Sequence, residues 1–497
     1  MRVSSLDLTP DQFRLLGHDL VERIAGFLEN LPDRPVNPPE TPLSVRRLLG
    51  DRPLPETGTD PAGLLAETFT LLFEHSLLTA HPRHLAYIIG SPAPLSALAD
   101  LLAASLDPNV SSWWRSAMAT EIEAQTVSWI AELVGYPANC GGLLVSGGSM
   151  ANYVGLLAAR KAHAPWEVRS QGLIEGGCRP IRLYASDQTH AWIEKAADIF
   201  GLGTNAIRWI PSDNDQKIDL MLLRAAIRTD RERGDLPFLV IGNAGTTATG
   251  ALDPLPELAA LCKEEELWFH VDGAYGAFAA MLGDAPQELL ALGQADSLAL
   301  DPHKWLYQPL EAGCVLVRDA DLLSETFTYH PPYYHFPAAE GEEPLNFYQL
   351  GPQNSRGFRA LKVWLSLQQA GRQGYQRMLA EDITLARLLF EMVQAHPELE
   401  AYTNNLSITT FRYVPSDLQG NQQAEAYLNQ LNSEILVQVQ TGGELYISNA
   451  ILKGTFLLRA CVVNFRTGVD DIEAIPEIVA RIGRAVDRRL RTKTSEV

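Results

Sequence analysis

Lys304 lies in the segment Asp301-Pro302-His303-Lys304-Trp305, between two short apolar runs at 295–300 and 313–317. Both runs are typical of β-strands, so Lys304 is predicted to follow a strand end, and strand ends in α/β folds face the crevice that binds ligands. An amine in a partly desolvated pocket loses its proton readily and attacks carbonyl groups. Lys304 is therefore a candidate for a Schiff base with an aldehyde cofactor, usually pyridoxal phosphate. Taken alone, the segment also fits a surface lysine in a turn.

Asp272 ends another apolar run, in His270-Val271-Asp272-Gly273-Ala274-Tyr275. A carboxylate at a strand end can pair with a protonated pyridine nitrogen, which keeps the ring electron-withdrawing and able to stabilise a carbanion. Ala274 is small enough to let such a ring pack against the strand. The alternative is an aspartate that caps the following helix.

Three further segments place polar groups at predicted strand ends. Ser146-Gly147-Gly148-Ser149 lies between a strand and a helix start, where free N–H groups and hydroxyls suit a phosphate. His190 lies between a strand and a helix, so its imidazole can lie flat on an aromatic ring, and the hydroxyls of Gly245-Thr246-Thr247 can contact a ring substituent. The respective alternatives are a tight turn, a helix-capping histidine and a polar loop. The joint occurrence of these groups, in chain order at strand ends, favours a cofactor site.

Apolar patterning predicts the elements that must position these groups. Short strands are predicted at 143–145, 181–184, 206–210, 238–241, 268–271, 297–300 and 314–317. Helix-length segments separate most of them, which predicts an α/β fold with a mostly parallel, seven-stranded sheet. Strands at 406–413, 444–448 and 455–460 predict a small α+β domain. We expect a helical N-terminal segment (1–85), a large cofactor-binding domain (86–375) and a small C-terminal domain (376–497).

Composition restricts partners and location. The net charge of -20 argues against nucleic acid and anionic membranes as partners. No uncharged apolar run approaches the ~18 residues of a membrane-spanning helix, and the N-terminus lacks an apolar signal core. The five cysteines are scattered without a Cys-x-x-Cys pair, which is typical of reduced thiols in the cytosol. We therefore expect a cytoplasmic protein without a membrane span or a metal site.

Over nearly its whole length the chain resembles the group II pyridoxal-phosphate-dependent amino-acid decarboxylases. This family includes the aromatic-L-amino-acid, histidine, tyrosine and glutamate decarboxylases. The most specific matches are Pro-His-Lys-Trp-Leu at 302–306 and Val-Asp-Gly-Ala-Tyr at 271–275, and others lie at 81–82, 120–123, 186–190, 358–362 and 458–460. The resemblance implies the fold-type I, aspartate aminotransferase-like architecture. It also implies an obligate homodimer with active sites at the interface, in which the N-terminal helices cross onto the partner.

The resemblance implies a role around the cofactor ring for each matching residue. Lys304 would form the Schiff base with pyridoxal 5′-phosphate, and Asp272 would pair with the pyridine nitrogen. Ala274 would pack under the ring and His190 would stack above it. Thr246 would lie near the ring hydroxyl.

The resemblance also implies which residues hold the phosphate. Gly148, Ser149 and Ser297 would bind it, and His303 would contact cofactor or substrate. Asp301 stands where relatives often have asparagine. A carboxylate beside a phosphate is repulsive, so the resemblance leaves the role of Asp301 open.

The implied reaction releases the substrate's α-carboxylate as CO2 and then returns a proton to the α-carbon. In the family the acid is a tyrosine on a loop before the helix that here begins near Arg356. An ungapped count back from Phe358 places Phe347 at that position, with Tyr348 beside it; Tyr333 and Tyr334 are further candidates. Relatives with phenylalanine there tend toward oxidative deamination, which gives an aldehyde.

The leading hypothesis is a decarboxylase that converts an L-amino acid to the amine and CO2. Its predicted catalytic residues are Lys304, His190, Asp272, His303 and Tyr348. The alternatives are an aldehyde-forming oxidative deaminase, a decarboxylase of an acidic amino acid, and a cofactor-binding protein without turnover.

The family's substrate pockets are lined by the segments near 87–89 and 111–115. Ile88 and Trp113 suit an apolar or aromatic side chain. Arg115 could pair with an acidic one, or could belong to a structural ion pair. On balance the sequence favours an aromatic substrate.

Overall fold

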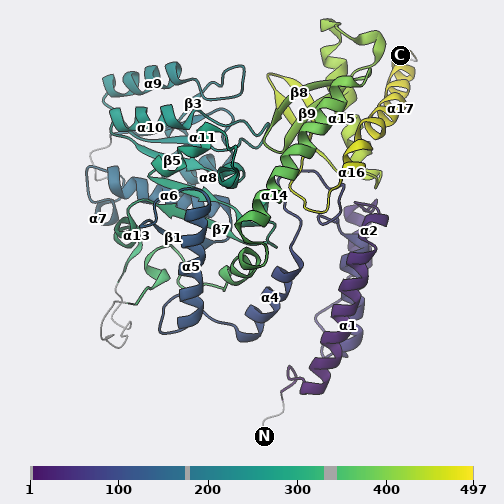
Figure 1. The fold of residues 1–497 in the computed structure, drawn as a ribbon, viewed down its shortest axis with the longest axis horizontal. Helices are drawn as coiled ribbons and strands as arrows, with labels where there is room; N and C mark the ends of the chain where they lie inside the picture. Colours follow the sequence, from purple (N-terminus) through teal and green to yellow (C-terminus); the bar gives the residue numbers. More distant parts are fainter. Residues whose placement is uncertain (1–3, 174–178, 330–343, 496–497) are drawn as a thin grey trace.

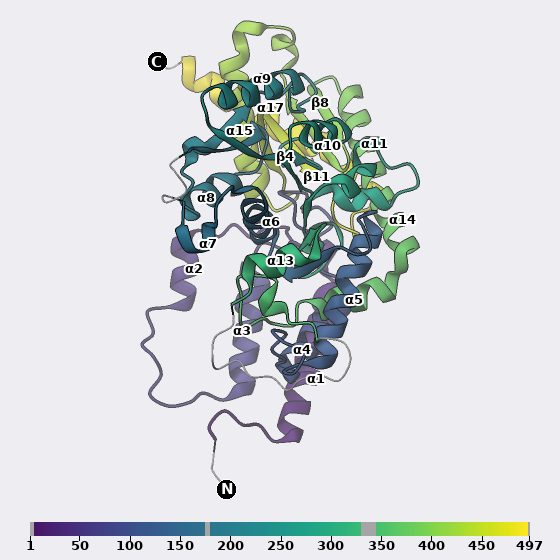
Figure 2. The ribbon, with the colours of Figure 1, turned by 90° about the vertical axis from the view of Figure 1, so that its left-hand side faces the viewer.

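The computed structural model describes residues 4–173, 179–329 and 344–495 of the 497-residue chain. Two β-sheets organise it, one built from strands within 141–317 and one from strands within 399–461 (Figure 1). The long helix α14 (Ala360–Ala395) lies between them and has non-helical backbone at Gly371. The N-terminal helices extend away from both sheets (Figures 1 and 2).

The large sheet has seven strands in the order β1-β7-β6-β5-β4-β2-β3. Strands β6, β5, β4, β2 and β3 are parallel, whereas β7 is antiparallel to both neighbours. The bounds are β1 (Gly141–Val145), β2 (Ile181–Ser186), β3 (Ile207–Ile210), β4 (Leu236–Asn243), β5 (Trp268–Asp272), β6 (Ser297–Leu300) and β7 (Gly313–Val317). The mostly parallel, seven-stranded sheet predicted from the sequence is therefore confirmed.

Helices cover both faces of this sheet, which is why its strands are continuous apolar runs. One face packs against α5 (Ala117–Leu133), α9 (Leu220–Glu232), α10 (Leu255–Glu264) and the first part of α14. The other face packs against α6 (Gly148–His163), α8 (Trp192–Ile199) and α13 (Ala320–Phe327). Three short helices complete this region: α7 (Val168–Gln171), α11 (Gln287–Leu290) and α12 (Pro302–Trp305).

The second sheet is antiparallel, with the order β10-β11-β9-β8. Its strands are β8 (Leu399–Asn405), β9 (Ile408–Tyr413), β10 (Ser448–Leu452) and β11 (Thr455–Cys461). They share a core with α14, α15 (Glu425–Thr441), α16 (Val469–Glu473) and α17 (Ile475–Ser495). The strand predicted at 444–448 is wrong in position, because β10 begins only at Ser448.

The predicted division between the large and small domains at residue 375 falls inside α14. That helix packs against the apolar cores of both sheets, so the boundary between two domains stays a prediction. None of the helices within the described ranges has the length and apolarity that a bilayer crossing requires.

The N-terminal helices form an arm, which we define as α1 (Pro10–Glu29), α2 (Pro42–Leu49) and α3 (Pro61–His75). Helix α1 begins at a capping box, in which the Thr9 hydroxyl accepts from the Gln12 backbone N–H and the Gln12 side chain accepts from that of Thr9. The Phe27 and Phe73 rings join α1 to α3, with centroids 4.6 Å apart. Helix α4 (Pro94–Leu106) follows the arm and packs against α14.

A buried ion pair between Arg356 and Glu123 ties the segment before α14 to the large sheet. The two side chains are 1% and 0% exposed. Arg356 also donates to the carbonyl oxygens of Val110 (2.8 Å) and Leu144 (2.6 Å), and Glu123 accepts from the Leu144 backbone N–H (2.9 Å). The pair thereby connects α5 and β1 to the start of α14.

We expect Arg356→Ala to lower the free energy of unfolding by about 3–5 kcal/mol, because it leaves the Glu123 carboxylate buried without its cation. Urea denaturation followed by circular dichroism measures this loss. Arg372→Ala is the matched control, since it removes a pair with Glu132 whose side chains are 44% and 69% exposed. That control should cost less than ~1 kcal/mol. Equal losses of unfolding free energy in the two variants would contradict the stabilising role of the buried Arg356–Glu123 pair.

Candidate active site

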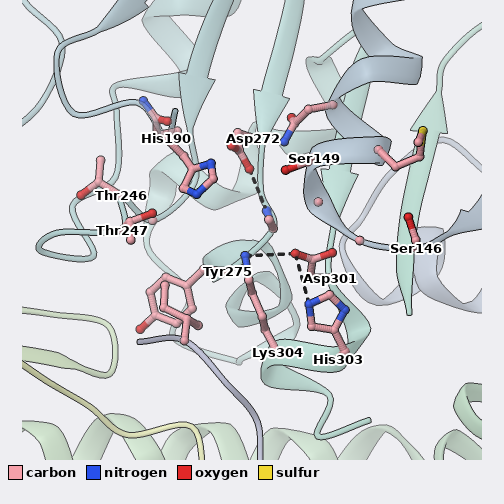
Figure 3. A pocket seen from close by; sticks show the side chains of 18 of the residues that line it. Ser146, Ser149, His190, Thr246, Thr247, Asp272, Tyr275, Asp301, His303 and Lys304 are labelled. Carbon is pink, nitrogen blue, oxygen red and sulfur yellow. Dashed lines mark hydrogen bonds and ion pairs between the residues drawn. The ribbon is translucent and has the colours of Figure 1, made fainter. Parts of the chain in front are cut away.

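A cavity of about 430 Å³ opens where β1, β2, β4, β5 and β6 end (Figure 3). Carboxyl ends of parallel strands share one edge of a sheet, which brings side chains distant in sequence to one place. The predicted residues that line this cavity are Gly148, Ser149, His190, Thr246, Asp272, Ala274, His303 and Lys304. The structure thus brings together most of the residues that the sequence singled out.

Lys304 lies in α12, whose N-cap residue is Asp301. Its amine lies 3.0 Å from Oδ2 of Asp301, whose side chain is only 3% exposed (Figure 3). The other carboxylate oxygen of Asp301 is buried and has no hydrogen-bond partner among the described residues. Gly90 packs against this turn so closely that a Cβ there would lie 2.1 Å from the Lys304 carbonyl oxygen. Asp301, left open by the sequence, is therefore the ion-pair partner of the lysine.

The C-terminal half of α14 holds in place the segment 301–307, which we call the lysine turn. Oδ2 of the buried Asp382 accepts from the Trp305 indole (2.8 Å) and from the Tyr307 hydroxyl (2.7 Å). The Trp305 ring also stacks on Tyr275, with centroids 5.0 Å apart. Burial raises the pKa of Asp382 to about 7. Two of the three residues that follow Lys304, Trp305 and Tyr307, are thus anchored to a helix that reaches the second sheet.

His303 is oriented by the backbone of Ala312. Its Nδ1–H donates to the Ala312 carbonyl oxygen (2.8 Å), which leaves Nε2 at 3.7 Å from Oδ2 of Asp301. Burial lowers the pKa of His303, with the Asp301 charge acting in the opposite direction. The imidazole therefore favours its neutral form beside the lysine.

Asp272 ends β5, and both of its carboxylate oxygens accept hydrogen bonds. Oδ2 accepts from the Trp192 indole N–H (2.8 Å), and Oδ1 accepts from the Ala274 backbone N–H (3.2 Å). His190 lies on the same side of the cavity, and its Nδ1 accepts from the Trp192 backbone N–H (3.2 Å) (Figure 3). A planar ring in the cavity would meet a carboxylate at its edge and an imidazole at its face.

The N-terminus of α6 forms a cradle for an anion. Its N-cap is Gly147, which provides no capping side chain, so the first N–H groups of this 16-residue helix face the cavity unblocked. A Cβ at Gly148 would lie 2.7 Å from Asp301 Oδ2 and 3.1 Å from the Ala274 Cβ. The close backbone approach therefore requires glycine, and Ser149 adds a hydroxyl.

Thr246 lines the opposite side of the cavity. Its hydroxyl lies 3.0 Å from that of Thr249 and accepts from the Ala251 backbone N–H (3.2 Å). These bonds hold the β4–α10 connection in shape at the mouth of the site.

Ser297 does not lie where it was predicted. Its side chain is fully buried, its Oγ accepts from the Trp268 indole (2.8 Å) and contacts His270 Nδ1 (2.7 Å), and it does not line the cavity. The reason is its place as the first residue of β6, because the cavity lies at the other end of that strand. A phosphate in the α6 cradle is therefore out of its reach.

Phe347 is not a residue of the substrate site. It is 1% exposed and lies under the Arg356 guanidinium, 4.7 Å from ring centroid to Cζ. Tyr348 is partly buried, donates its backbone N–H to the Ser111 carbonyl oxygen (3.0 Å) and does not line the cavity of its own chain. Tyr333 and Tyr334 lie outside the described residues. The count was wrong for Phe347 because that side chain belongs to the core, and with it goes the argument from Phe347 for an aldehyde product.

Several lining residues were not predicted. Asn152, Asn243, Met150 and Glu311 line the cavity, as do Ser146, Gly147 and Tyr275 of segments that the sequence did single out. Asn152 could have been found as the residue one helical turn after Gly148 on the same face of α6. Glu311 follows β6 and α12 in an irregular segment that has no periodicity, so no sequence signal marked it.

The described residues fit pyridoxal phosphate. The α6 cradle suits a phosphate, Asp272 suits a protonated ring nitrogen, and Lys304 suits the aldehyde carbon. Because Asp301 forms an ion pair with Lys304, backbone N–H groups and hydroxyls would hold the phosphate.

Comparison with known proteins agrees with this chemistry. The conserved domain of pyridoxal-dependent decarboxylases matches residues 45–414. The aromatic-L-amino-acid decarboxylase of Bacillus atrophaeus is 34% identical over 469 residues, which cover 94% of this chain and 95% of the relative. A phenylacetaldehyde synthase of Petunia hybrida is 28% identical over 463 residues, covering 92% and 91%.

A similar fold occurs in the crystal structure of Oryza sativa TDC with PLP and tryptamine. That chain has a TM-score of 0.89 and 24% identity, covering 97% of this chain and 99% of the other. The likeness supports the fold-type I architecture that the seven-stranded sheet shows. Fold, cavity and sequence similarity agree that this chain belongs to the pyridoxal-dependent decarboxylases and binds pyridoxal 5′-phosphate.

Proposed function

We propose that this enzyme decarboxylates an aromatic L-amino acid to the corresponding amine and CO2. The observation that carries the proposal is the convergence of Lys304, Asp272 and His190 on one cavity in a member of this family. A protein that only bound the cofactor could use the same three residues, so release of CO2 from a substrate separates the two functions. The bound cofactor supplies a ring that accepts the electron pair left when the substrate's carboxylate departs.

The residues of the cavity would have different roles in this reaction. Lys304 would carry the cofactor and yield its place to the substrate amine, with Asp301 ready to receive the free ammonium at 3.0 Å. Asp272 would keep the ring nitrogen protonated through its negative charge. His190 would lie against the ring and keep it in the plane that orients the departing carboxylate.

The remaining predicted residues would seat the cofactor. Gly148 and Ser149 would hold the phosphate at the α6 N-terminus, and Ala274 would leave room for the ring. Thr246 would approach the ring hydroxyl, and His303, neutral through burial, would contact cofactor or substrate.

The lining of the cavity favours an aromatic over an acidic side chain. Ile88 and Tyr275 provide apolar surface. Among the described lining residues, Asp272, Asp301 and Glu311 are carboxylates, whereas Lys304 is the lone lysine or arginine. A second substrate carboxylate would meet net negative charge there.

The acidic alternative loses its sequence argument as well. Arg115, the candidate partner for an acidic substrate, donates through Nη1 to the Ser111 hydroxyl (3.3 Å) and does not line the cavity. The aromatic reading also agrees with the name of the Bacillus atrophaeus relative.

A panel of L-amino acids tests the proposed reaction. Holoenzyme is incubated with L-tryptophan, L-tyrosine, L-phenylalanine, L-histidine and L-glutamate, and CO2, amine, aldehyde and peroxide are measured. We expect an aromatic amino acid to exceed histidine and glutamate in kcat/KM by at least about tenfold, because the apolar wall discriminates by side-chain burial. CO2 from none of them would contradict the reaction. Release of an aldehyde with consumption of oxygen would instead indicate an aldehyde-forming reaction, as the name of the Petunia relative describes.

Lys304→Ala is expected to abolish the absorbance band of the covalently held cofactor, because no amine remains to bond its aldehyde carbon. The ultraviolet–visible spectrum of the purified protein measures this. Lys217→Ala, which removes a peripheral ion pair with Glu288, should keep the band. A band that survives in Lys304→Ala would show that another amine carries the cofactor.

We also propose a homodimer in the cytoplasm, formed through the arm and the outer face of α4. Apolar side chains are exposed in a line on α4 and along the arm, where a second copy would cover them. They include Phe13, Leu15, Leu64, Leu72, Leu98, Leu101, Leu102 and Leu106. Free Cys140, Cys262, Cys314 and Cys461 agree with a reducing compartment.

Within this dimer, Tyr348 would serve as the acid for the α-carbon of the partner's substrate, since it does not line its own cavity. Co-expression of differently tagged Lys304→Ala and Tyr348→Phe chains tests both ideas. The mixed dimer contains one site with an intact lysine and an intact tyrosine from the partner, so activity should reappear although each homodimer is impaired.

Three outcomes would count against this arrangement. A monomer by light scattering would refute the dimer. Mixed dimers without activity would place the tyrosine in its own chain's site. Full activity of Tyr348→Phe, with loss in Tyr333→Phe, would move the acid to residue 333.

A further inference from the structure

Trp192 contacts both groups that would hold the cofactor ring. It is the first residue of α8 and is 1% exposed. Its indole N–H donates to Asp272 Oδ2 at 2.8 Å, and its backbone N–H donates to His190 Nδ1 at 3.2 Å. One residue therefore supplies a donor to each of two groups that come from different strand ends.

We propose that Trp192 is a positioning residue, whose two N–H groups set the Asp272 carboxylate and the His190 imidazole for the cofactor ring. The inference rests on the proposed roles of Asp272 and His190. Trp192 does not line the cavity, so it acts through its neighbours and not on the substrate.

The indole bond fixes the plane of the Asp272 carboxylate. The Ala274 backbone N–H holds Oδ1 at 3.2 Å, and the indole holds Oδ2. A carboxylate offers about four lone-pair sites, so each oxygen keeps capacity for a further donor. With one donor on each side, rotation about the Cβ–Cγ bond would break a hydrogen bond. The ring nitrogen would therefore meet a carboxylate already turned toward it.

The backbone bond fixes the tautomer of His190. Because Nδ1 accepts the Trp192 N–H, the proton of the neutral ring must lie on Nε2. This bond holds the exposed imidazole against the start of α8. Its face is thereby held at the side of the cavity where Figure 3 shows it next to Asp272.

Trp192 is itself held by the layer beneath it. Its ring meets the His270 imidazole edge-on, with centroids 5.8 Å apart and an interplanar angle of 79°. His270 contacts Ser297 Oγ (2.7 Å) and Asn152 Oδ1 (2.6 Å), and burial lowers its pKa to about 4, so it is neutral near pH 7. Ser297, wrongly predicted at the phosphate, thus belongs to the support of the ring-binding groups.

A double-mutant cycle on cofactor affinity tests the inference. The dissociation constant of pyridoxal phosphate is measured by absorbance titration for wild type, Trp192→Phe, Asp272→Ala and the double variant. Phenylalanine keeps an aromatic ring in the buried space but removes the indole donor. Trp364→Phe is the matched control, because it also removes an indole hydrogen bond, to Gln125 at 2.7 Å, far from the cavity.

We expect Trp192→Phe to weaken cofactor binding by about tenfold or more, as for loss of a hydrogen bond to a charged group. In the Asp272→Ala background the same change should shift the constant less than about twofold, because the carboxylate that it acts on is gone. In steady-state kinetics kcat should fall while KM stays within about twofold. Trp364→Phe should match wild type in both assays.

Equal weakening in both backgrounds would show that Trp192 only fills space, and would overturn the inference. Unchanged affinity in Trp192→Phe with weakened binding in Asp272→Ala would also overturn it and leave the role of Asp272 intact. Unchanged affinity in Asp272→Ala would instead refute the proposed role of that carboxylate. If Trp192→Phe does not fold, benzothienylalanine at residue 192 keeps the indole shape without its N–H and enters the same cycle.

Discussion

The parallel register between β5 and β6 is the constraint on which the site depends. Asp272 pairs with Ala299 across these strands, so β5 and β6 end at the same edge of the sheet. Two residues beyond Ala299 the backbone reaches Asp301, and the short helix α12 then presents Lys304. A slip of one residue would turn Asp272 to the opposite face of the sheet and separate it from the lysine. The hydrogen bonds between β5 and β6 therefore set the position of the carboxylate relative to the amine.

The lysine turn is held from three directions. Asp301 binds the amine, Gly90 packs on the backbone, and Asp382 accepts from the two aromatic residues that follow. Asp382 lies on the part of α14 that also contributes to the core of the second sheet. The second sheet therefore contributes to the site, because α14 connects its core to the segment that carries the Lys304 amine. This is the physical reason why a site on the large sheet needs the C-terminal part of the chain.

Support for Asp272 comes from the other face of the large sheet, where α6 and α8 pack. Trp192 contacts Asp272 directly, and beneath it His270 connects Ser297 and Asn152. The network is buried, and polar groups in such a place are kept because each finds a partner. Asn152 also lines the cavity, so the same hydrogen bonds that fill the interior set one of its walls. The shape of the cavity and the packing of the core therefore depend on the same contacts.

Short-range patterns were enough to predict most of the fold and much of the site. Continuous apolar strands alternating with helices predicted a parallel sheet, and polar residues after those strands predicted one cavity. Lys304, Asp272, His190 and the Gly148 cradle all lie where these rules place them. The rules work because strand direction and the edge of the sheet follow from connectivity alone.

The pattern along the chain could not predict the contacts between helices and strands. Ser297 was assigned to the cavity although it begins its strand, and Phe347 was counted into a loop although Arg356 holds it in the core. Trp192 carried no signal, because its partner Asp272 lies 80 residues away and only the packing of α8 on the sheet joins them. The sequence by itself determined which chemical groups are present and at which edge they gather. Tertiary structure alone decided which way each group faces and what holds it, because those depend on side chains from elements that no local periodicity connects.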